Sequence, residues 1–212
     1  MTGTQYRVLF MGASYGSLLA TKLSLAGHAS TMVCLPEEVE AFNANGAVVR
    51  FPVRGRDGLV EVCTKDLPGV VNAAGPGDVD PNDFDLVCLA MQEPQYRVPV
   101  VAELLGRVAA SGVPAMSIMN MPPLAYLHRI PGLDMRGLRD CYTDPSVWDA
   151  FDTANITLCS PDPQAFRPPE DPINVLQVTL PTNFKAARFE SETHTAIIQK
   201  LAADVEAATL TT

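Results

Sequence analysis

Short apolar runs alternate along most of the chain with longer segments whose apolar residues recur every three or four positions. The first run, residues 8–10, is typical of a strand buried on both faces. In the segment after it, Leu19 and Leu23 fall on one helical face, and Gly27 stands where a left-handed C-terminal cap is expected. A second strand begins at Thr31. The opening stretch therefore predicts a strand–turn–helix–strand unit.

The same alternation continues after this unit. A hairpin is predicted over residues 47–63, and further strands are predicted at 70–71, 85–91, 113–119, 156–159 and 173–180. Helices are predicted at 36–46, 97–110, 124–128, 147–151 and 190–208, the second closed by Gly112. In the last two long helices, the residues expected on the buried side are Val100, Val101, Leu104, Leu105, Val108, Ile197, Ile198, Leu201 and Val205. Strands alternating with helices predict an α/β fold with a mainly parallel, doubly wound sheet.

Composition narrows the class of protein. Apolar residues make up 47% of the 212 and charged residues 18%, which indicates a globular domain with a substantial core. The net charge of −9 argues against a nucleic-acid binder. Five cysteines without a C-x-x-C pair favour reduced thiols and a cytoplasmic location. No apolar run approaches the ~20 residues that span a bilayer, so no membrane contact is expected.

The turn after the first strand carries the candidate chemistry. Gly12 and Gly16 bracket it, just where a helix begins. The first turn of a helix leaves backbone N–H groups unpaired and carries partial positive charge, and glycine lets a pyrophosphate approach closely. With Gly16 as the third glycine of G-x-G-x-x-G, Met11 and Ala13 occupy the first two places. The turn is therefore interpreted as an eroded dinucleotide fingerprint, and the alternative is a structural turn without nucleotide.

Ligands of such sheets lie beyond the carboxyl ends of the strands, which here are followed by residues 11–16, 34–38, 91–95 and 120–123. The predicted cofactor-binding residues are Gly12, Ala13, Ser14, Tyr15, Gly16, Cys34, Glu37, Met91, Gln92 and Asn120. The amide of Asn120 could bind cofactor or substrate, or it could cap the loop that follows its strand.

The order of short motifs resembles the N-terminal domain of the ketopantoate reductase family over about residues 6–125. The motifs are G-S-L-L-A at 16–20, L-A-G-H at 25–28, N-A-N-G at 43–46, D-L-V-C-L-A-M-Q at 85–92, and a strand ending at Asn120. The resemblance implies a Rossmann-like domain, NADP as cofactor, and hydride transfer to the ketone carbon of a small 2-oxo acid. It also implies that Asn120 matches a family asparagine near the nicotinamide.

The family's catalytic lysine belongs to a second, helical domain that is absent from the given chain. We therefore expect this lysine beyond Thr212, and the catalytic residue stays unknown. Residues 1–190 are assigned to the dinucleotide-binding domain, and 191–212 to a terminal helix leading to the domain boundary. The expected partner is a small-molecule substrate, with a homodimer as a further expectation.

Two positions depart from the family pattern. The family arginine that pairs with the 2′-phosphate of NADP would lie near Cys34, where Glu37 and Glu38 follow instead. These acids would suit the ribose hydroxyls of NAD, or they cap a helix, so NAD stays open beside NADP. Arginines at 50, 54 and 56 could reach a phosphate or belong to the surface. The family lysine after the central strand is replaced by Gln92, and a non-catalytic nucleotide-binding or interaction module is therefore the alternative function.

The residues that a short-chain dehydrogenase or a metal site would need are absent from the sequence. No tyrosine has a lysine four positions later, which excludes a short-chain dehydrogenase, and no histidine or cysteine cluster has metal-ligand spacing. His28 is expected at the surface after a helix end, and His194 is expected to be exposed. The proline-rich residues 161–172 are expected to form a stiff surface connection.

Overall fold

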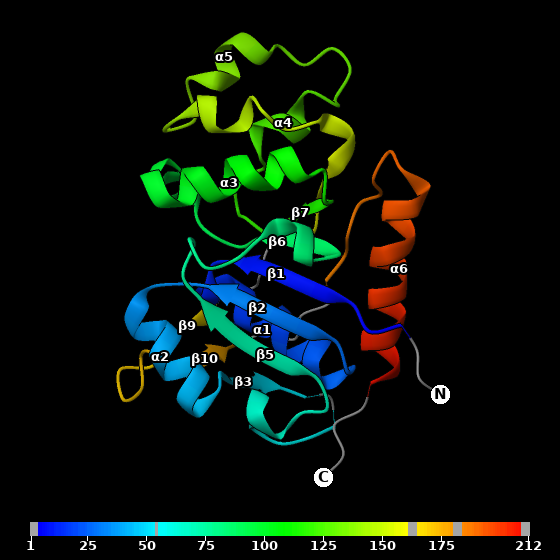
Figure 1. Ribbon diagram of the computed structural model, residues 1–212. Coiled ribbons are helices and arrows are strands. Elements are labelled where there is room, and N and C mark those ends of the chain that lie inside the picture. The colour runs from blue at the N-terminus through cyan, green and yellow to red at the C-terminus, as the bar shows by residue number, and fades with distance from the viewer. Residues whose placement is uncertain (1–3, 54, 161–164, 180–183, 209–212) are drawn as a thin grey trace.

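A six-stranded parallel sheet organises the fold of the computed structural model, which describes residues 4–53, 55–160, 165–179 and 184–208 (Figure 1). Its strand order is β5-β2-β1-β6-β7-β8, and every pairing is parallel. The strands are β1 (Arg7–Met11), β2 (Ala29–Val33), β5 (Val70–Ala74), β6 (Leu86–Leu89), β7 (Ala115–Ser117) and β8 (Ile156–Leu158). The first strand lies inside, and the order reverses beside it, as in doubly wound dinucleotide-binding folds. The predicted fold class is confirmed.

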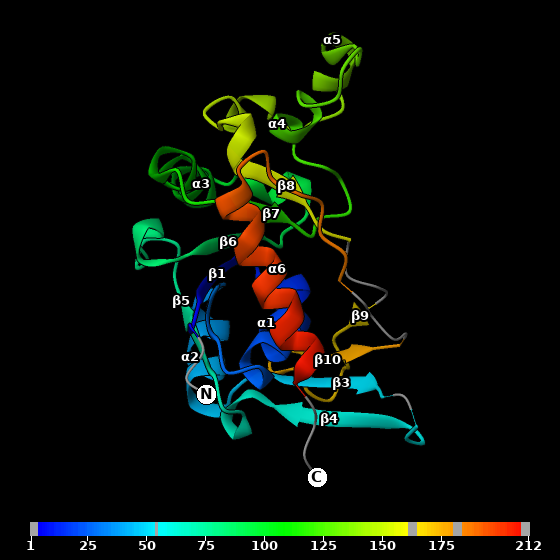
Figure 2. The same cartoon turned by 90° about the vertical axis from the view of Figure 1, so that its right-hand side faces the viewer.

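Alternate residues of β1 belong to two separate hydrophobic cores, one on each face of the sheet, because successive side chains of a strand point to opposite faces. Val8 and Phe10 pack toward one set of helices, and Leu9 and Met11 pack toward the other. The first face is covered by α1 (Ala13–Leu25), α2 (Pro36–Asn45) and α6 (Glu192–Ala207). The second face is covered by α3 (Pro99–Ser111) and α4 (Leu124–Leu127). Figure 2 shows α6 alongside α1 on the first face.

A smaller four-stranded sheet, with order β4-β3-β10-β9, covers the outer side of α1 (Figure 2). Its strands are β3 (Val48–Pro52), β4 (Leu59–Cys63), β9 (Ala165–Phe166) and β10 (Val175–Val178). Strands β3 and β4 form the predicted hairpin, and β10 joins β3 in parallel. Leu18 of α1 packs against Val49, Leu176 and Val178, which fixes this sheet beside the start of α1.

The proline-rich connection is more structured than the sequence indicated. The prediction of a stiff surface connection is wrong at residues 165–166, because Ala165 pairs with Val178 and Phe166 with Gln177. Residues 161–164 and Leu180 lie outside the described residues. A strand of two residues has no periodicity that a sequence pattern could reveal. Its consequence is that residue 167 is placed beside the turn after β1.

Glycine ends α1 as predicted. Gly27 has φ of +88°, and the His28 N–H donates to Leu23 O while the Gly27 N–H donates to Ser24 O. These are the two hydrogen bonds of a Schellman motif. The start of α1 lies earlier than the bracketing glycines suggested, since the helix begins at Ala13 and Gly16 falls in its first turn.

The prediction for His28 is wrong, because its side chain is only 3% exposed. The Schellman turn folds the imidazole beneath α6, where Nδ1 accepts the Tyr6 N–H and Nε2 lies 3.2 Å from Asp204. Burial lowers the pKa of His28, and the nearby Asp204 carboxylate offsets only part of this. His194 is half-buried, with its ring edge against Phe189, so the prediction that it is exposed is also wrong.

The remaining helices agree with the prediction in position and differ in detail. The predicted helix 97–110 corresponds to α3, which begins two residues later, follows a 3₁₀ turn, η3 (Glu93–Arg97), and is closed by Gly112 with φ of +71°. Val100 is 55% exposed although the pattern placed it inside, and the other four predicted apolar positions of α3 are buried. The sequence did not predict α5 (Met135–Arg139). Short 3₁₀ turns complete the described elements: η1 (Thr64–Asp66), η2 (Pro81–Asp83), η4 (Pro145–Trp148) and η5 (Thr153–Asn155).

In α6, Ile198 and Leu201 are buried as predicted, whereas Ile197 and Val205 pack at the edge of the core and are only partly buried. Across the described ranges, no helix combines the length and the apolar character needed to cross a membrane.

Candidate functional site

A cleft of about 840 Å³ opens at the carboxyl edge of the parallel sheet, where the strand order reverses between β1 and β6. Its walls come from the first turn of α1, the start of α2, the loop after β6, the start of α3, and β9. Of the predicted cofactor-binding residues, the cleft is lined by Gly12, Ala13, Ser14, Tyr15, Cys34, Met91 and Gln92. The sequence therefore located the edge of the sheet at which the cleft forms.

Gly12 brings two strand ends close together at the base of the cleft. Its φ is +115°, and a Cβ placed there would lie 2.5 Å from the Ala90 carbonyl oxygen. Its N–H donates to the Val33 carbonyl at 3.0 Å. Glycine is required here because both the backbone angle and the close approach exclude a side chain. This turn aims the N-terminus of α1 into the cleft.

The N-terminus of α1 carries neither a capping side chain nor an acidic residue in its first turn. Ala13, Ser14 and Tyr15 form that turn and line the cleft. Since helix N-termini hold unpaired N–H groups and partial positive charge, this wall of the cleft suits an anion. Gly16 does not line the cleft; it packs against Phe10, where a Cβ would lie 3.1 Å from the ring.

Three polar side chains from three different turns meet at the Tyr15 hydroxyl. The oxygen accepts Nε2 of Gln92 at 3.1 Å and Nδ2 of Asn120 at 3.5 Å. Tyr15 comes from α1, Gln92 follows β6, and Asn120 follows β7. Asn120 thus lies beside the cleft without lining it. Together the phenol and the two amides form a neutral, hydrogen-bonding group at one side of the cleft.

An arginine that the sequence reasoning missed enters the cleft from the small sheet. Arg167 follows β9, and its Nε donates to the Ser14 hydroxyl at 3.1 Å. Its second terminal nitrogen donates to Glu38 at 2.9 Å, and its guanidinium stands over the Phe42 ring. Arg167 lies 153 positions from Ser14 in a segment without clear periodicity, so no local signal could have found it.

Glu38 occupies the cleft in place of the predicted Glu37, which is exposed and does not line it. The reason is the register of α2. Glu38 is the third residue of this helix, and its second carboxylate oxygen accepts the Leu35 N–H at 3.1 Å, as the N3 acid of a capping box does. Glu38 therefore points back toward the end of β2, and Glu37 points away.

The arginines of the hairpin lie elsewhere. Arg50 is held on the small sheet by Glu61 at 2.8 Å and Glu170 at 3.0 Å, and it does not line the cleft. Arg56 is exposed, and residue 54 lies outside the described residues. The surface interpretation of Arg50 and Arg56 therefore agrees with the structure, and Arg167 is the cleft-lining arginine of the described chain.

The thiol in the cleft is held in its neutral form. Burial raises the pKa of Cys34 to about 12, and the neighbouring Glu38 carboxylate acts in the same direction. A neutral thiol is a weak nucleophile, so the role that the structure supports for Cys34 is to shape the cleft. Within the described residues no group of three His, Cys, Asp or Glu side chains could hold a metal ion.

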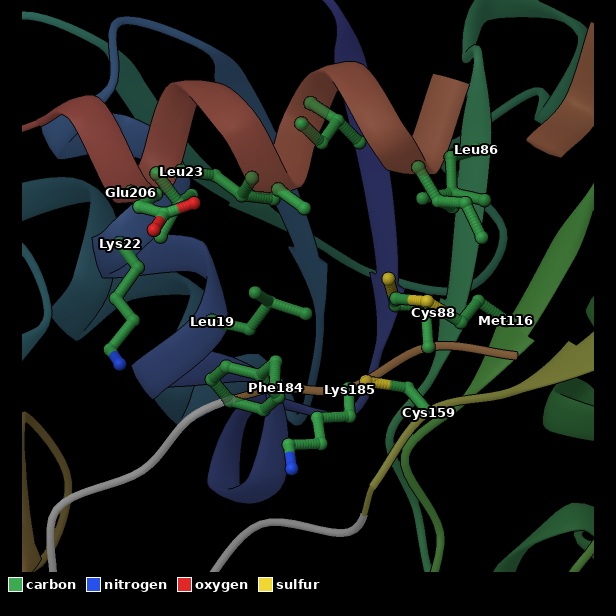
Figure 3. A pocket seen from close by; sticks show the side chains of 15 residues that line it. Leu19, Lys22, Leu23, Leu86, Cys88, Met116, Cys159, Phe184, Lys185 and Glu206 are labelled. Carbon is green, nitrogen blue, oxygen red and sulfur yellow. The ribbon is translucent and has the colours of Figure 1, made fainter. Parts of the chain in front are cut away.

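A second cavity, of about 480 Å³, lies between α1, α6 and the sheet (Figure 3). Figure 3 shows Leu19, Cys88 and Met116 projecting into it, with the amines of Lys22 and Lys185 toward its edge. It includes none of the residues of the glycine turn, and its wall is mainly apolar. It lacks the helix N-terminus that would suit a pyrophosphate, so the 840 Å³ cleft is the candidate site.

The sheet order, the glycine turn and the position of the cleft define a Rossmann-like, doubly wound domain. No family model matches the chain, and no curated protein matches it by sequence. Solved structures do share its fold. A putative ketopantoate reductase from Ralstonia solanacearum MolK2 matches 96% of this chain and 59% of its own, with a TM-score of 0.67 and 18% identity.

Two further structures show the same relation. A probable 2-dehydropantoate 2-reductase from Bacillus subtilis matches 92% of this chain and 54% of its own, with a TM-score of 0.57 and 18% identity. D-mandelate dehydrogenase, solved with NADH and anilino(oxo)acetate, matches 95% of this chain and 54% of its own, with a TM-score of 0.55 and 15% identity. The chain thus has the fold of ketopantoate reductase structures and spans between 54% and 59% of their length.

Proposed function

We propose that this chain is the cofactor domain of a nicotinamide-dinucleotide-dependent oxidoreductase that reduces a small 2-oxo acid with NADPH. The observation that carries the proposal is the uncapped N-terminus of α1, which opens on the 840 Å³ cleft at the point where the strand order reverses. That volume lies within the range of about 300–1,000 Å³ that small-molecule and cofactor sites occupy.

In this proposal the pyrophosphate binds the first-turn amides of α1, where Ser14 and Tyr15 line the cleft. The nicotinamide lies toward the neutral group formed by Tyr15, Gln92 and Asn120. Their hydroxyl and amide groups would hydrogen-bond cofactor or substrate without adding charge. Bound cofactor supplies a hydride for the ketone carbon, and these residues orient the two reactants.

The proton for the new alkoxide comes, in the same proposal, from a lysine of a second domain expected beyond Thr212. Two facts support the choice of substrate. The structures that share the fold include ketopantoate reductases, and the mandelate dehydrogenase was solved with an oxo acid beside NADH. We place the activity in the reducing cytoplasm, in keeping with an odd number of cysteines, three of them buried.

Titration of NADPH and NADH into the folded 212-residue chain, followed by nicotinamide fluorescence, tests the cofactor part. The variant Tyr15→Asp places a carboxylate at the proposed pyrophosphate site. Because this carboxylate has a charge of the same sign as the pyrophosphate, and charged interactions at such a site amount to about 1.5–3 kcal/mol, it should weaken binding roughly 10- to 100-fold. The matched control Gln199→Asp adds the same charge on an exposed position of α6 and should leave binding unchanged. Wild-type protein that is folded and binds neither dinucleotide would overturn the proposal.

A second candidate is a nucleotide-binding module without catalysis. It is favoured by Gln92, whose neutral amide is engaged with Tyr15 where the resembling family carries a lysine. Both candidates bind the dinucleotide, so oxidation of NADPH in the presence of 2-oxo acids separates them in a protein that includes the proposed lysine-bearing domain: the reductase turns over and the module does not. Turnover by this 212-residue chain would exclude the module.

A further inference from the structure

Arg167 lies between the two parts of the cleft that a dinucleotide's adenosine half would touch. One side of its guanidinium contacts Ser14 in the first turn of α1, and the other contacts Glu38 in the first turn of α2. The side chains of Arg167 and Glu38 are only 19% and 18% exposed, so water screens this pair weakly. When a negatively charged ligand enters the cleft, the Arg167 guanidinium therefore has two possible partners, the Glu38 carboxylate and the ligand.

The guanidinium has several contacts besides the one with Glu38. One terminal nitrogen donates to the Pro172 carbonyl at 3.0 Å and to the Ile173 carbonyl, and Nε donates to Ser14. The Phe42 ring, 5.8 Å away, supports the cation from its face. Of the five N–H donors, these contacts use three, and Glu38 uses one of the two on the remaining nitrogen. That nitrogen is therefore the part of Arg167 that can serve an incoming ligand.

Glu38 is also held independently, since its other oxygen accepts the Leu35 N–H. The carboxylate thus remains near the end of β2 when it parts from Arg167. At this place in doubly wound folds, a carboxylate accepts the ribose hydroxyls of NAD, and an arginine accommodates the 2′-phosphate of NADP. Here both chemistries stand side by side, and a phosphate is the stronger partner for a guanidinium because it offers more charge and a paired set of acceptors.

We infer that Arg167 selects the dinucleotide that carries a 2′-phosphate by exchanging its contact with Glu38 for that phosphate. The inference rests on the proposed function, since it assumes that the adenosine half of a dinucleotide reaches this wall of the cleft. It assigns the selecting cation to the residue after β9 of the small sheet and not to the end of β2. The small sheet therefore takes part in cofactor choice as well as in covering α1.

The test compares NADPH and NADH affinities of wild type, Arg167→Gln, Glu38→Gln and Arg50→Gln. Arg167→Gln should weaken NADPH binding roughly 10- to 100-fold, as expected for loss of a charged hydrogen bond, with NADH changed less than about 3-fold. Glu38→Gln should strengthen NADPH binding, because it removes both the competitor for Arg167 and a repelling charge. Arg50→Gln is the matched control on the same sheet: it removes an ion-paired arginine outside the cleft and should change neither affinity.

Competition by ADP-ribose and by 2′-phospho-ADP-ribose separates a selecting role from a structural one. Arg167→Gln should lower the preference for the phosphorylated fragment, and a loss of stability alone would weaken both fragments equally. Equal weakening of both, unchanged NADPH binding, or a wild type that prefers NADH would each overturn the inference. Failure of the proposed function looks different, because folded wild type would then bind neither dinucleotide.

Discussion

Replacing Gly12 with alanine should destabilise the protein more than replacing Gly16, the other glycine at the start of α1, with alanine. At φ of +115° a residue with a Cβ is strained, which costs about 1–3 kcal/mol. The added Cβ would also lie 2.5 Å from the Ala90 carbonyl oxygen and 2.9 Å from the Met91 side chain. Overpacking of this kind typically costs about 1–3 kcal/mol more. Because the Ala90 carbonyl oxygen is a backbone atom at the end of the neighbouring strand, it has little freedom to move.

Urea unfolding followed by circular dichroism measures the effect. The combined loss of about 2–6 kcal/mol, with a slope of about 2 kcal/mol/M, moves the midpoint down by roughly 1–3 M. Gly27→Ala is the matched control: its φ is +88°, but no atom lies within 4 Å of the added Cβ. It should lose only about 1–2 kcal/mol from backbone strain. Equal midpoints for the two variants would refute the reasoning, because the contact with Ala90 would then contribute nothing.

Three further predictions concern the rest of the fold. Because burial lowers the pKa of His28 below its unfolded value, the stability contributed by neutral His28 should be full above about pH 6.5 and should fall as the pH drops below it. The urea midpoint of the wild type should therefore be lower at pH 5 than at pH 8, and this difference should be far smaller in His28→Asn. An equally large difference between the two pH values in the variant would contradict the prediction. Tyr96→Phe should cost about 1–3 kcal/mol in the same assay, since the buried Met91 N–H loses its acceptor 3.3 Å away, and a neutral result would show that this bond is not needed. Thiol titration of the native protein at pH 8 should modify the exposed Cys141 first. Cys34, Cys88 and Cys159 should react only after unfolding, because burial raises the pKa of all three thiols. Early labelling of Cys34, detected by mass spectrometry, would argue against a closed cleft wall.

The sequence predicted those parts of the fold whose periodicity is local. Strand β1 reads as an apolar run because both of its faces are buried, and α1 reads as a helix that Gly27 ends. The alternation of such elements led to the parallel sheet, and the sheet located the edge where the cleft lies. Gly12, Tyr15 and Gln92 could be assigned to that edge because each directly follows a strand or opens the helix after it.

The parts that failed depend on contacts distant in sequence or on a single helical register. Arg167 reaches Ser14 through a strand of two residues, and no pattern in a proline-rich segment announces that pairing. Glu38 replaces Glu37 because its hydrogen bond from the Leu35 N–H fixes which acid turns inward. His28 was placed at the surface because its burial comes from α6, which lies more than 160 positions away. Arg167 shows that chemistry at a βα turn can be completed by a segment far along the chain.

The most direct test of the account is a crystal structure of the 212-residue chain grown with NADPH. The account predicts the pyrophosphate against the backbone amides of Ser14 and Tyr15, with the nicotinamide toward Asn120. A dinucleotide bound elsewhere, or a cleft that stays empty at saturating NADPH, would contradict it.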